Sequence, residues 1–264
     1  MLRSRLSLCI SAALAALLTV PQTVFAAPYA CGDDIRIFNT GVDASLARIT
    51  TLGTPDPRWK VANKPVDDVT TLGVIAAWDT PVTARLGPPN TWTWADVPTA
   101  AWLARNTEMS AAKYTYYKLD VDLAASVNPA TFQVHTTMHA DDQVVAVFLN
   151  GQLLPGSQLA DSWAGGVYVS VPSTFTIANQ WRTGANELVV QVFNNSATVN
   201  PASARKWGGF ALEASTASCT TRPVAATVAP VPATHPLALV IGGLLVAGIG
   251  MRVARRQANY QRSL

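Results

Sequence analysis

The chain contains little charge and few of the residues that carry out acid–base or metal chemistry. Only 13% of its 264 residues are Asp, Glu, Lys or Arg, and there are three histidines and three glutamates. A globular protein typically has about 25% charged residues. So low a fraction excludes a disordered chain and a coiled coil, because both need many charged residues. It also excludes a protein that coats nucleic acid, since that function needs a dense basic surface.

The motifs of the common catalytic sites are absent too. The sequence has no G-x-S-x-G nucleophile motif and no phosphate-binding glycine loop. His135 and His139 are four residues apart, but no glutamate lies between them, so the H-E-x-x-H zinc pattern is missing. A catalytic pair of carboxylates, as in glycosidases, remains an alternative because aspartates are available, although no spacing in the sequence supports one. We therefore expect a protein that is not an enzyme and binds no cofactor.

The N-terminus has the pattern of a secretory signal peptide over residues 1–27. Two arginines precede an apolar run from Leu8 to Val20, and small residues lead up to Ala26 and Ala27. This order of charge, apolar run and small residues predicts cleavage after Ala26 or Ala27. An uncleaved anchor helix is the alternative.

The C-terminus predicts a membrane anchor. Residues 223–236 are rich in proline, which favours an extended linker. The uncharged run from Leu237 to Met251 follows, and with its flanks it predicts a transmembrane helix over residues 237–253. Residues 254–264 form a basic tail, which predicts a cytoplasmic location for this end.

This C-terminal arrangement resembles the sorting tails of Gram-negative surface proteins. Val231 to Pro236, the short glycine-containing apolar run and the arginines together resemble the PEP-CTERM and IPTL-CTERM types, although the Pro-Glu-Pro signature is absent. The resemblance implies recognition by a dedicated sorting protease. Whether the tail is cleaved stays open.

Residues 28–222 remain as one ectodomain, and its charge differs in sign from that of the whole chain. The full chain has a formal charge of +3. The ectodomain holds 13 basic and 16 acidic residues, a net charge of −3, because six arginines belong to the two ends. A mildly acidic ectodomain gives no support to nucleic-acid binding.

Two cysteines remain in the ectodomain after Cys9 is removed with the signal peptide. Cys31 and Cys219 lie at its two boundaries. Exported proteins usually pair their cysteines, so we predict a disulfide that brings both ends of the domain together. Two free thiols are the alternative.

The secondary structure of the ectodomain is predicted to be β. Alternating apolar residues over 114–123 and 131–138 predict strands with one buried face, and the apolar run 143–149 predicts a fully buried strand. Asn150-Gly151 follows as a hairpin turn. Further strands are expected at 173–178, 187–193 and 209–214, with at most one helical turn in 98–105. Many short strands separated by turns predict an all-β domain, a β-sandwich or jelly roll.

Several short elements, in their order along the domain, resemble the galactose-binding-domain-like jelly rolls of bacterial surface proteins. They are Asn39–Asp43, the D-x-x-W of 56–59, the tryptophan-rich stretch 92–102, Tyr114–Tyr116, the AD…LNG of 140–151, the G-x-N-x-L of 184–188 and 194–210. The resemblance implies a jelly-roll fold that binds a ligand, often carbohydrate, and rarely catalyses a reaction.

Tryptophan is the residue type that points to a ligand. All eight tryptophans lie in the ectodomain. Sugar rings stack on aromatic faces, and Trp92 and Trp94 share a face if extended, so we predict that Trp92, Trp94 and Trp163 contact a ligand. The alternative for each is a place in the core, which we expect for Trp59.

Three acidic pairs make a structural calcium site an alternative. They are Asp33-Asp34, Asp67-Asp68 and Asp141-Asp142. Carboxylates and carbonyls are calcium ligands, but no Asp-rich twelve-residue loop is present. For Asp141 we expect instead that the side chain stabilises a turn.

We therefore expect an exported, membrane-anchored or surface-sorted protein. Its ectodomain binds an extracellular ligand, with carbohydrate as the first candidate, and it has no nucleic-acid partner. The main alternative is a structural component of an extracellular matrix or biofilm without a small ligand. An exported hydrolase is the third hypothesis.

Overall fold

The computed structural model describes residues 27–63, 71–85, 93–109, 113–163, 169–194 and 207–222. The chain divides into two units, Met1–Pro223 and Val224–Leu264, and every described residue belongs to the first. The predicted linker, apolar segment and basic tail lie outside the described residues, as do residues 1–26 of the predicted signal peptide. Among the residues described, no helix is long and apolar enough to cross a bilayer.

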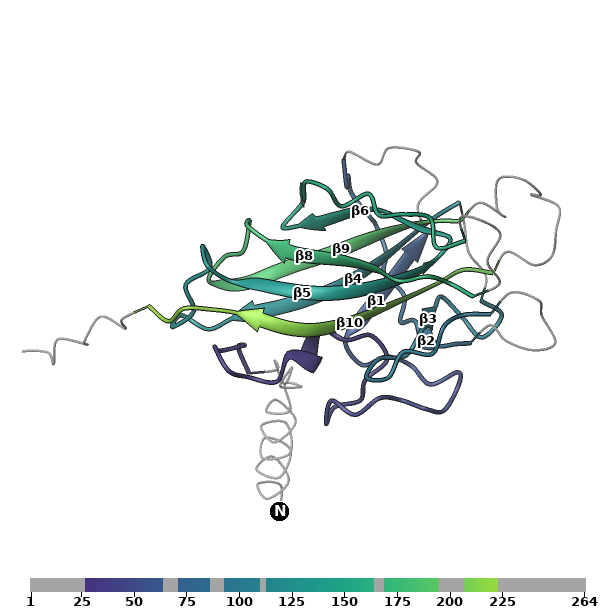
Figure 1. Cartoon of the computed structure of the whole chain (residues 1–264), viewed down its shortest axis with the longest axis horizontal. Helices are drawn as coiled ribbons and strands as arrows, with labels where there is room; N and C mark the ends of the chain where they lie inside the picture. The colour runs from purple at the N-terminus through teal and green to yellow at the C-terminus, as the bar shows by residue number, and fades with distance from the viewer. Residues whose placement is uncertain are drawn as a thin grey trace, which may run out of the picture. The chain divides into compact units, whose positions relative to one another are not determined.

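Two antiparallel five-stranded sheets make up the domain (Figure 1). The first sheet has the order β1-β4-β9-β6-β7, and the second has the order β2-β3-β10-β5-β8. The strands of the first sheet are β1 (Trp59–Asn63), β4 (Tyr114–Leu123), β6 (Gln143–Leu149), β7 (Gln152–Leu153) and β9 (Gly184–Phe193). Those of the second are β2 (Val82–Thr83), β3 (Leu103–Ala104), β5 (Gln133–Asp141), β8 (Ser173–Ala178) and β10 (Gly209–Ser218).

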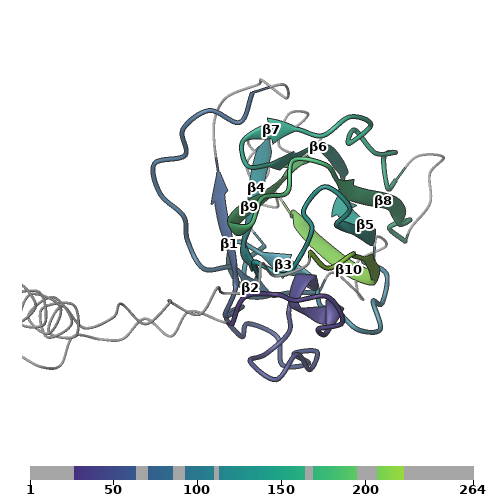
Figure 2. The ribbon, with the colours of Figure 1, turned by 90° about the vertical axis from the view of Figure 1, so that its left-hand side faces the viewer.

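The sheets pack face to face as a β-sandwich, which confirms the all-β prediction (Figure 2). Of the longer strands, β4, β6 and β9 belong to the first sheet and β5, β8 and β10 to the second, so consecutive long strands change sheet each time. Alternation of apolar residues causes this packing. In β4, for example, Tyr117, Leu119, Val121 and Leu123 all point into the core between the sheets.

Predicted and observed strands agree where the apolar pattern is strong. Strands 114–123, 143–149 and 173–178 have the predicted boundaries. The short strands β1, β2, β3 and β7 were not predicted, because two to five residues hold too little periodicity. Residues 98–105, where at most one helical turn was expected, contain none; β3 occupies part of that stretch and pairs with β10. The described residues contain a short 3₁₀ helix, η2 (Ile35–Phe38).

The D-x-x-W element begins β1. Asp56 is buried, and its carboxylate accepts the backbone N–H groups of Gly41, Arg58 and Trp59 at 2.7, 2.8 and 2.7 Å. Trp59 itself is 1% exposed and donates its indole N–H to the carbonyl of Asn39, so its expected place in the core is confirmed. One carboxylate thus joins the first loop of the domain to its first strand.

The predicted disulfide is present. Cys31 and Cys219 are bonded, with their Cα atoms 5.7 Å apart and 188 residues apart in sequence. Around this seam Tyr29, Phe132 and Trp181 pack with tilted or edge-to-face rings, the centroids 4.9 to 5.5 Å apart. The start and end of the domain therefore meet at one end of the sandwich, the left-hand end in Figure 1.

Candidate ligand-binding site

Four of the tryptophans lie together at the end of the sandwich opposite the disulfide. There β5 ends and β10 begins, with Asp141 paired to Gly209, while β9 ends beside the start of β4. A second apolar cluster lies at this end, separate from the core between the sheets. We call it the tryptophan cluster; its aromatic members are Trp94, Trp102, Trp163 and Trp207.

Trp94 is held rigidly inside this cluster. Its ring stacks on Trp102 with centroids 4.5 Å apart and planes 19° apart, and its indole N–H donates to the Asp141 carboxylate at 2.8 Å. Gly209 permits this position, because a Cβ there would lie 2.4 Å from a ring carbon of Trp94. Trp94 is only 2% exposed, so its stacking partner is Trp102 rather than a ligand.

The other two predicted ligand contacts differ in what the structure shows. Trp163 is half-buried at the border of the tryptophan cluster, and Asp161 accepts its backbone N–H at 2.8 Å. Trp92 lies outside the described residues, two positions before Trp94. Ligand contact through Trp92 and Trp163 stays a prediction.

Asp141 is an ionisable group buried within the tryptophan cluster. Burial raises the pKa of its carboxyl well above the ordinary value, and the neighbouring Asp142 carboxylate raises it further. Hydrogen bonds from the side chains of Trp94 and Trp163 act in the opposite direction. The expectation that Asp141 stabilises a turn is wrong, since it ends strand β5 and its carboxyl orients Trp94.

His139 is the second buried ionisable group at this end. It is 5% exposed, its ring lies 5.7 Å from that of Trp102, and its Nδ1 has no hydrogen-bond partner among the described residues. Burial lowers the pKa of His139. His135, by contrast, faces outward and hydrogen-bonds the Thr176 hydroxyl at 2.9 Å. The two histidines thus have separate surroundings.

A groove opens beside the tryptophan cluster. Its cavity measures about 390 Å³, and a smaller one of about 180 Å³ adjoins it, sharing Leu52, Thr83, Ala84 and Arg85 in its lining. Trp102 forms part of the wall, and the backbone N–H of Ala84 donates to the Trp102 carbonyl at 2.9 Å. We call this the arginine groove, because Arg48 and Arg85 both line it.

Charged groups of both signs border the arginine groove. Arg48 donates to Asp96 at 2.6 Å, and this bond lowers the pKa of the Asp96 carboxyl. The Nε of Arg48 is buried without a hydrogen-bond partner among the described residues. Arg85 is exposed, and no salt bridge of its guanidinium occurs among them either. The groove thus offers the exposed guanidinium of Arg85 and an Arg48–Asp96 ion pair beside a buried indole.

A larger cavity of about 530 Å³ lies toward the disulfide end, along β4 and β9. Leu119 and Val121 line it, together with the acidic side chains of Asp120, Asp122 and Glu187. Two of these acids already have partners, since Lys118 bonds Glu187 at 2.9 Å and Lys60 bonds Asp120 at 2.7 Å. None of the described residues that line this cavity is a tryptophan.

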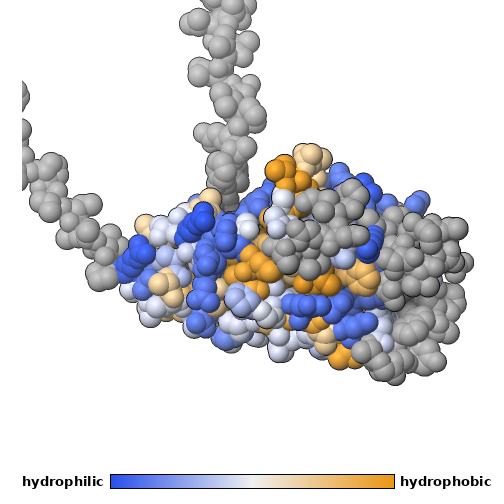
Figure 3. Space-filling model, turned by 90° about the horizontal axis from the view of Figure 1, so that it is seen from above, coloured by the Kyte–Doolittle hydropathy of each residue, from blue (hydrophilic) through white to orange (hydrophobic). Residues whose placement is uncertain are grey.

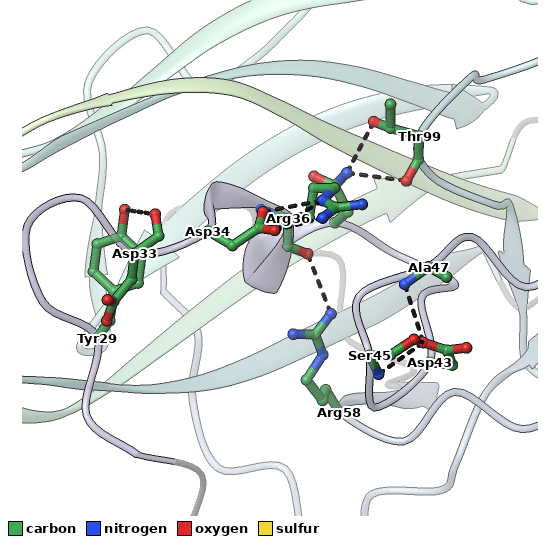
Figure 4. Close-up of polar contacts among 10 residues, drawn as sticks. Tyr29, Asp33, Asp34, Arg36, Asp43, Ser45, Ala47, Arg58 and Thr99 are labelled. Carbon is green, nitrogen blue, oxygen red and sulfur yellow. Dashed lines mark hydrogen bonds and ion pairs between the residues drawn. The ribbon is translucent and has the colours of Figure 1, made fainter.

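The acidic pair Asp33-Asp34, a candidate for a structural calcium site, has other contacts. Asp34 accepts the backbone N–H of Arg36 at the start of η2 and pairs with its guanidinium at 2.6 Å (Figure 4). Asp33 accepts the backbone N–H of Ala30 at 2.7 Å. Asp67-Asp68 lies outside the described residues. In the part of the chain that is described, no three His, Cys, Asp or Glu residues are grouped so as to hold a metal ion.

Comparisons with known proteins give only distant structural likenesses. No family model matches the chain, and no curated protein matches it. A β-glucosidase from Kluyveromyces marxianus is similar at a TM-score of 0.27 and 10% identity, over 60% of this chain and 15% of the enzyme. A family 35 carbohydrate-binding module from Clostridium thermocellum has a TM-score of 0.26 and 9% identity, over 45% of this chain and 80% of the module. A CBM35 from Paenibacillus barcinonensis has a TM-score of 0.26 and 7% identity, over 47% of this chain and 84% of the module.

Proposed function

We propose that the domain is a non-enzymatic carbohydrate-binding jelly roll, exported and held at the membrane or cell surface by its C-terminal segment. The observation that carries the proposal is the arginine groove, in which the exposed guanidinium of Arg85 and the Arg48–Asp96 ion pair line one cavity. The alternation of long strands between the two sheets supports the jelly-roll assignment. The disulfide supports an oxidising location outside the cytoplasm.

The chemistry of the groove suits a sugar. A pyranose has an apolar ring face and a border of hydroxyls, so it needs an aromatic surface and several hydrogen-bonding groups close together. Trp102 is 4% exposed and closes one side of the groove, while Arg48, Arg85 and Asp96 supply donors and acceptors.

Rigidity of the tryptophan cluster supports the same function. Trp102 is fixed by the Trp94 ring on one side and donates its indole N–H to the Ala95 carbonyl at 2.8 Å. Trp94 is in turn fixed by Asp141. A binding wall that is already ordered loses little conformational entropy when the ligand arrives.

A glycan array probed with the full chain tests the proposal. We expect binding that falls about tenfold or more in Arg85→Ala, because a charge-assisted hydrogen bond is lost. Arg182→Ala is the matched control, since Arg182 is exposed in the loop before β9, at the opposite end of the sandwich. Trp92→Ala and Trp163→Ala test the two remaining predicted contacts.

Two results would contradict the proposal. One is binding of no glycan at all, and the other is binding that Arg85→Ala and Arg182→Ala affect equally. The bound glycan is also recovered, and its molecular mass is measured by mass spectrometry. An intact glycan agrees with a binding protein, whereas shortened products would favour the exported hydrolase.

A further inference from the structure

The two sheets of the sandwich have four edges, and both edges of the first sheet are covered by other parts of the chain. At the β1 edge, Val61 and Asp79 exchange two backbone hydrogen bonds of 2.9 and 2.8 Å. At the β6–β7 edge, the segment 154–159 bonds back to the β6 carbonyls of Val147 and Val144 at 2.8 and 2.9 Å. Neither edge offers a row of unpaired backbone groups to a second chain.

The second sheet has one covered edge and one open edge. At β2, Thr83 donates to the Thr54 carbonyl and accepts from the Gly53 N–H, at 2.9 and 2.8 Å. Strand β8 is six residues long and pairs only with β5. Among the described residues, no backbone group of another segment bonds to its far side. Within the part of the chain that is described, the open edge is therefore β8.

The direction of the β8 backbone groups follows from one side-chain contact. The Thr136 hydroxyl on β5 donates to the Phe175 carbonyl at 2.8 Å, so this carbonyl points toward β5. Backbone groups of successive residues in a strand point to opposite sides. The N–H and C=O groups of Thr174, Thr176 and Ala178 therefore point away from β5, toward the open side.

This edge carries none of the charged side chains with which proteins usually block edge pairing. No residue from Val169 to Ala178 is charged, whereas edge strands that avoid association usually carry Lys or another charge. Val169 and Val171 are 48% and 50% exposed just before β8, which adds apolar surface. Figure 3 looks down on the upper side of Figure 1 and shows apolar surface exposed among hydrophilic residues there. Pro172 limits the open edge at its N-terminal side.

We propose that β8 pairs in antiparallel fashion with β8 of a second copy of this chain, about a two-fold axis at Thr176. In this register Thr176 faces its own counterpart, and Thr174 faces Ala178 of the partner subunit. All three outward-pointing residues then donate one backbone hydrogen bond and accept one. Phe175 lies opposite Ile177 of the partner subunit on the core-facing side, an apolar pair.

A second copy fits this edge better than an unrelated chain for two reasons. An isologous contact requires a surface complementary to itself, and an uncharged strand brings no like charges together across the two-fold axis. The contact also leaves the arginine groove free, because that groove is lined from segments 48–52, 83–85 and 95–102. Pairing joins the second sheets of two domains into one continuous sheet.

Cysteine cross-linking of the full chain tests the register. In Thr176→Cys the two introduced residues face each other with Cα atoms about 5.5 Å apart, within the range of a disulfide. In Thr174→Cys they are offset by four positions, about 13 Å along the strand, which a disulfide cannot bridge. We expect a disulfide-linked dimer from Thr176→Cys and none from Thr174→Cys under the same mild oxidation. Equal cross-linking of both, or of neither, would overturn the register.

The association itself is measured by analytical ultracentrifugation of the full chain in detergent. Thr174→Pro removes an N–H that points to the open side and leaves the β5 ladder intact. We expect it to raise the dimer dissociation constant about tenfold. Thr174→Val, which keeps the N–H, is the control and should change the constant less than about twofold. A monomer at all concentrations, or the same constant in both variants, would overturn the proposal. Circular dichroism checks that each variant is folded.

Discussion

At one end of the sandwich a disulfide and a group of apolar rings hold the chain together, whereas at the other end two buried ionisable groups lie among tryptophans. The disulfide end joins Cys31 to Cys219 beside Tyr29, Phe132 and Trp181. The tryptophan end buries Asp141 and His139, and the Nδ1 of His139 is unpaired among the described residues. Burying an ionisable group costs free energy unless it is well paired.

The two ends therefore contribute differently to the stability of the domain. The disulfide end restricts the unfolded chain and fills the core, so its contribution does not depend on a ligand. At the tryptophan end, a buried carboxylate fixes the position of one ring. Asp141 accepts the indole N–H of Trp94, and Trp94 stacks on Trp102. Such positions are typical of ligand sites, where geometry matters more than stability.

Removing the disulfide should have the largest effect on stability. The double variant Cys31→Ser, Cys219→Ser frees a loop of 188 residues. We expect the free energy of unfolding to fall by roughly 4 kcal/mol, since the closed loop is long. Urea unfolding of the variant and of the wild type measures the difference. A loss below about 1 kcal/mol would show that the aromatic packing alone holds the two ends of the chain together.

Filling the space at Gly209 should have the next largest effect. In Gly209→Ala the new Cβ meets the Trp94 ring at 2.4 Å, and that ring cannot move freely because Asp141 and Trp102 hold it. We expect a loss of about 2 kcal/mol in the free energy of unfolding. The double variant Gly209→Ala, Trp94→Phe removes the ring carbons in conflict and should recover part of that loss. If the double variant loses the sum of both single losses, the two positions are not coupled.

The buried histidine should make the tryptophan end sensitive to acid. Burial lowers the pKa of His139 in the folded protein from its ordinary value of 6.5. The unfolded state therefore binds its proton first, so the contribution of His139 is fully present above pH 6.5 and is lost as the pH falls through the folded pKa. We expect the melting temperature of the wild type to fall more between pH 7 and pH 5 than that of His139→Gln. His135→Gln, which changes the outward-facing histidine, should follow the wild type.

Loss of Arg85 should have the smallest effect on stability. Arg85 is exposed and forms no salt bridge among the described residues, so Arg85→Ala should change the free energy of unfolding by less than about 0.5 kcal/mol. The same variant should weaken glycan binding, as proposed above. A clear loss of stability would show that the arginine groove is part of the structural support of the domain.

Much of the fold could be predicted because its signals are local. Strands β4, β6 and β8 have their predicted boundaries, since alternating or continuous apolar residues fix which face is buried. The disulfide followed from two cysteines in an exported domain, and Trp59 was expected in the core. Each of these inferences needs only the residues of one segment or the compartment in which the protein folds.

The candidate site could be predicted only in part. The tryptophan-rich stretch contributes Trp94 and Trp102 to the tryptophan cluster, but Trp94 stacks on Trp102 rather than on a ligand. Arg48 and Arg85, which line the groove, carry no motif in the sequence. Their role depends on the packing of three segments that lie far apart along the chain.

The sequence by itself determined the composition of the strands, the all-β class, the disulfide and the acidic charge of the ectodomain, because these depend on residue type and local spacing. Only the tertiary structure decided which tryptophan is buried, which carboxyl supports it, where a groove opens and which sheet edge stays uncovered. Those properties depend on which segments meet in space. Side-chain periodicity tells which face of a strand is buried, but not which element covers it.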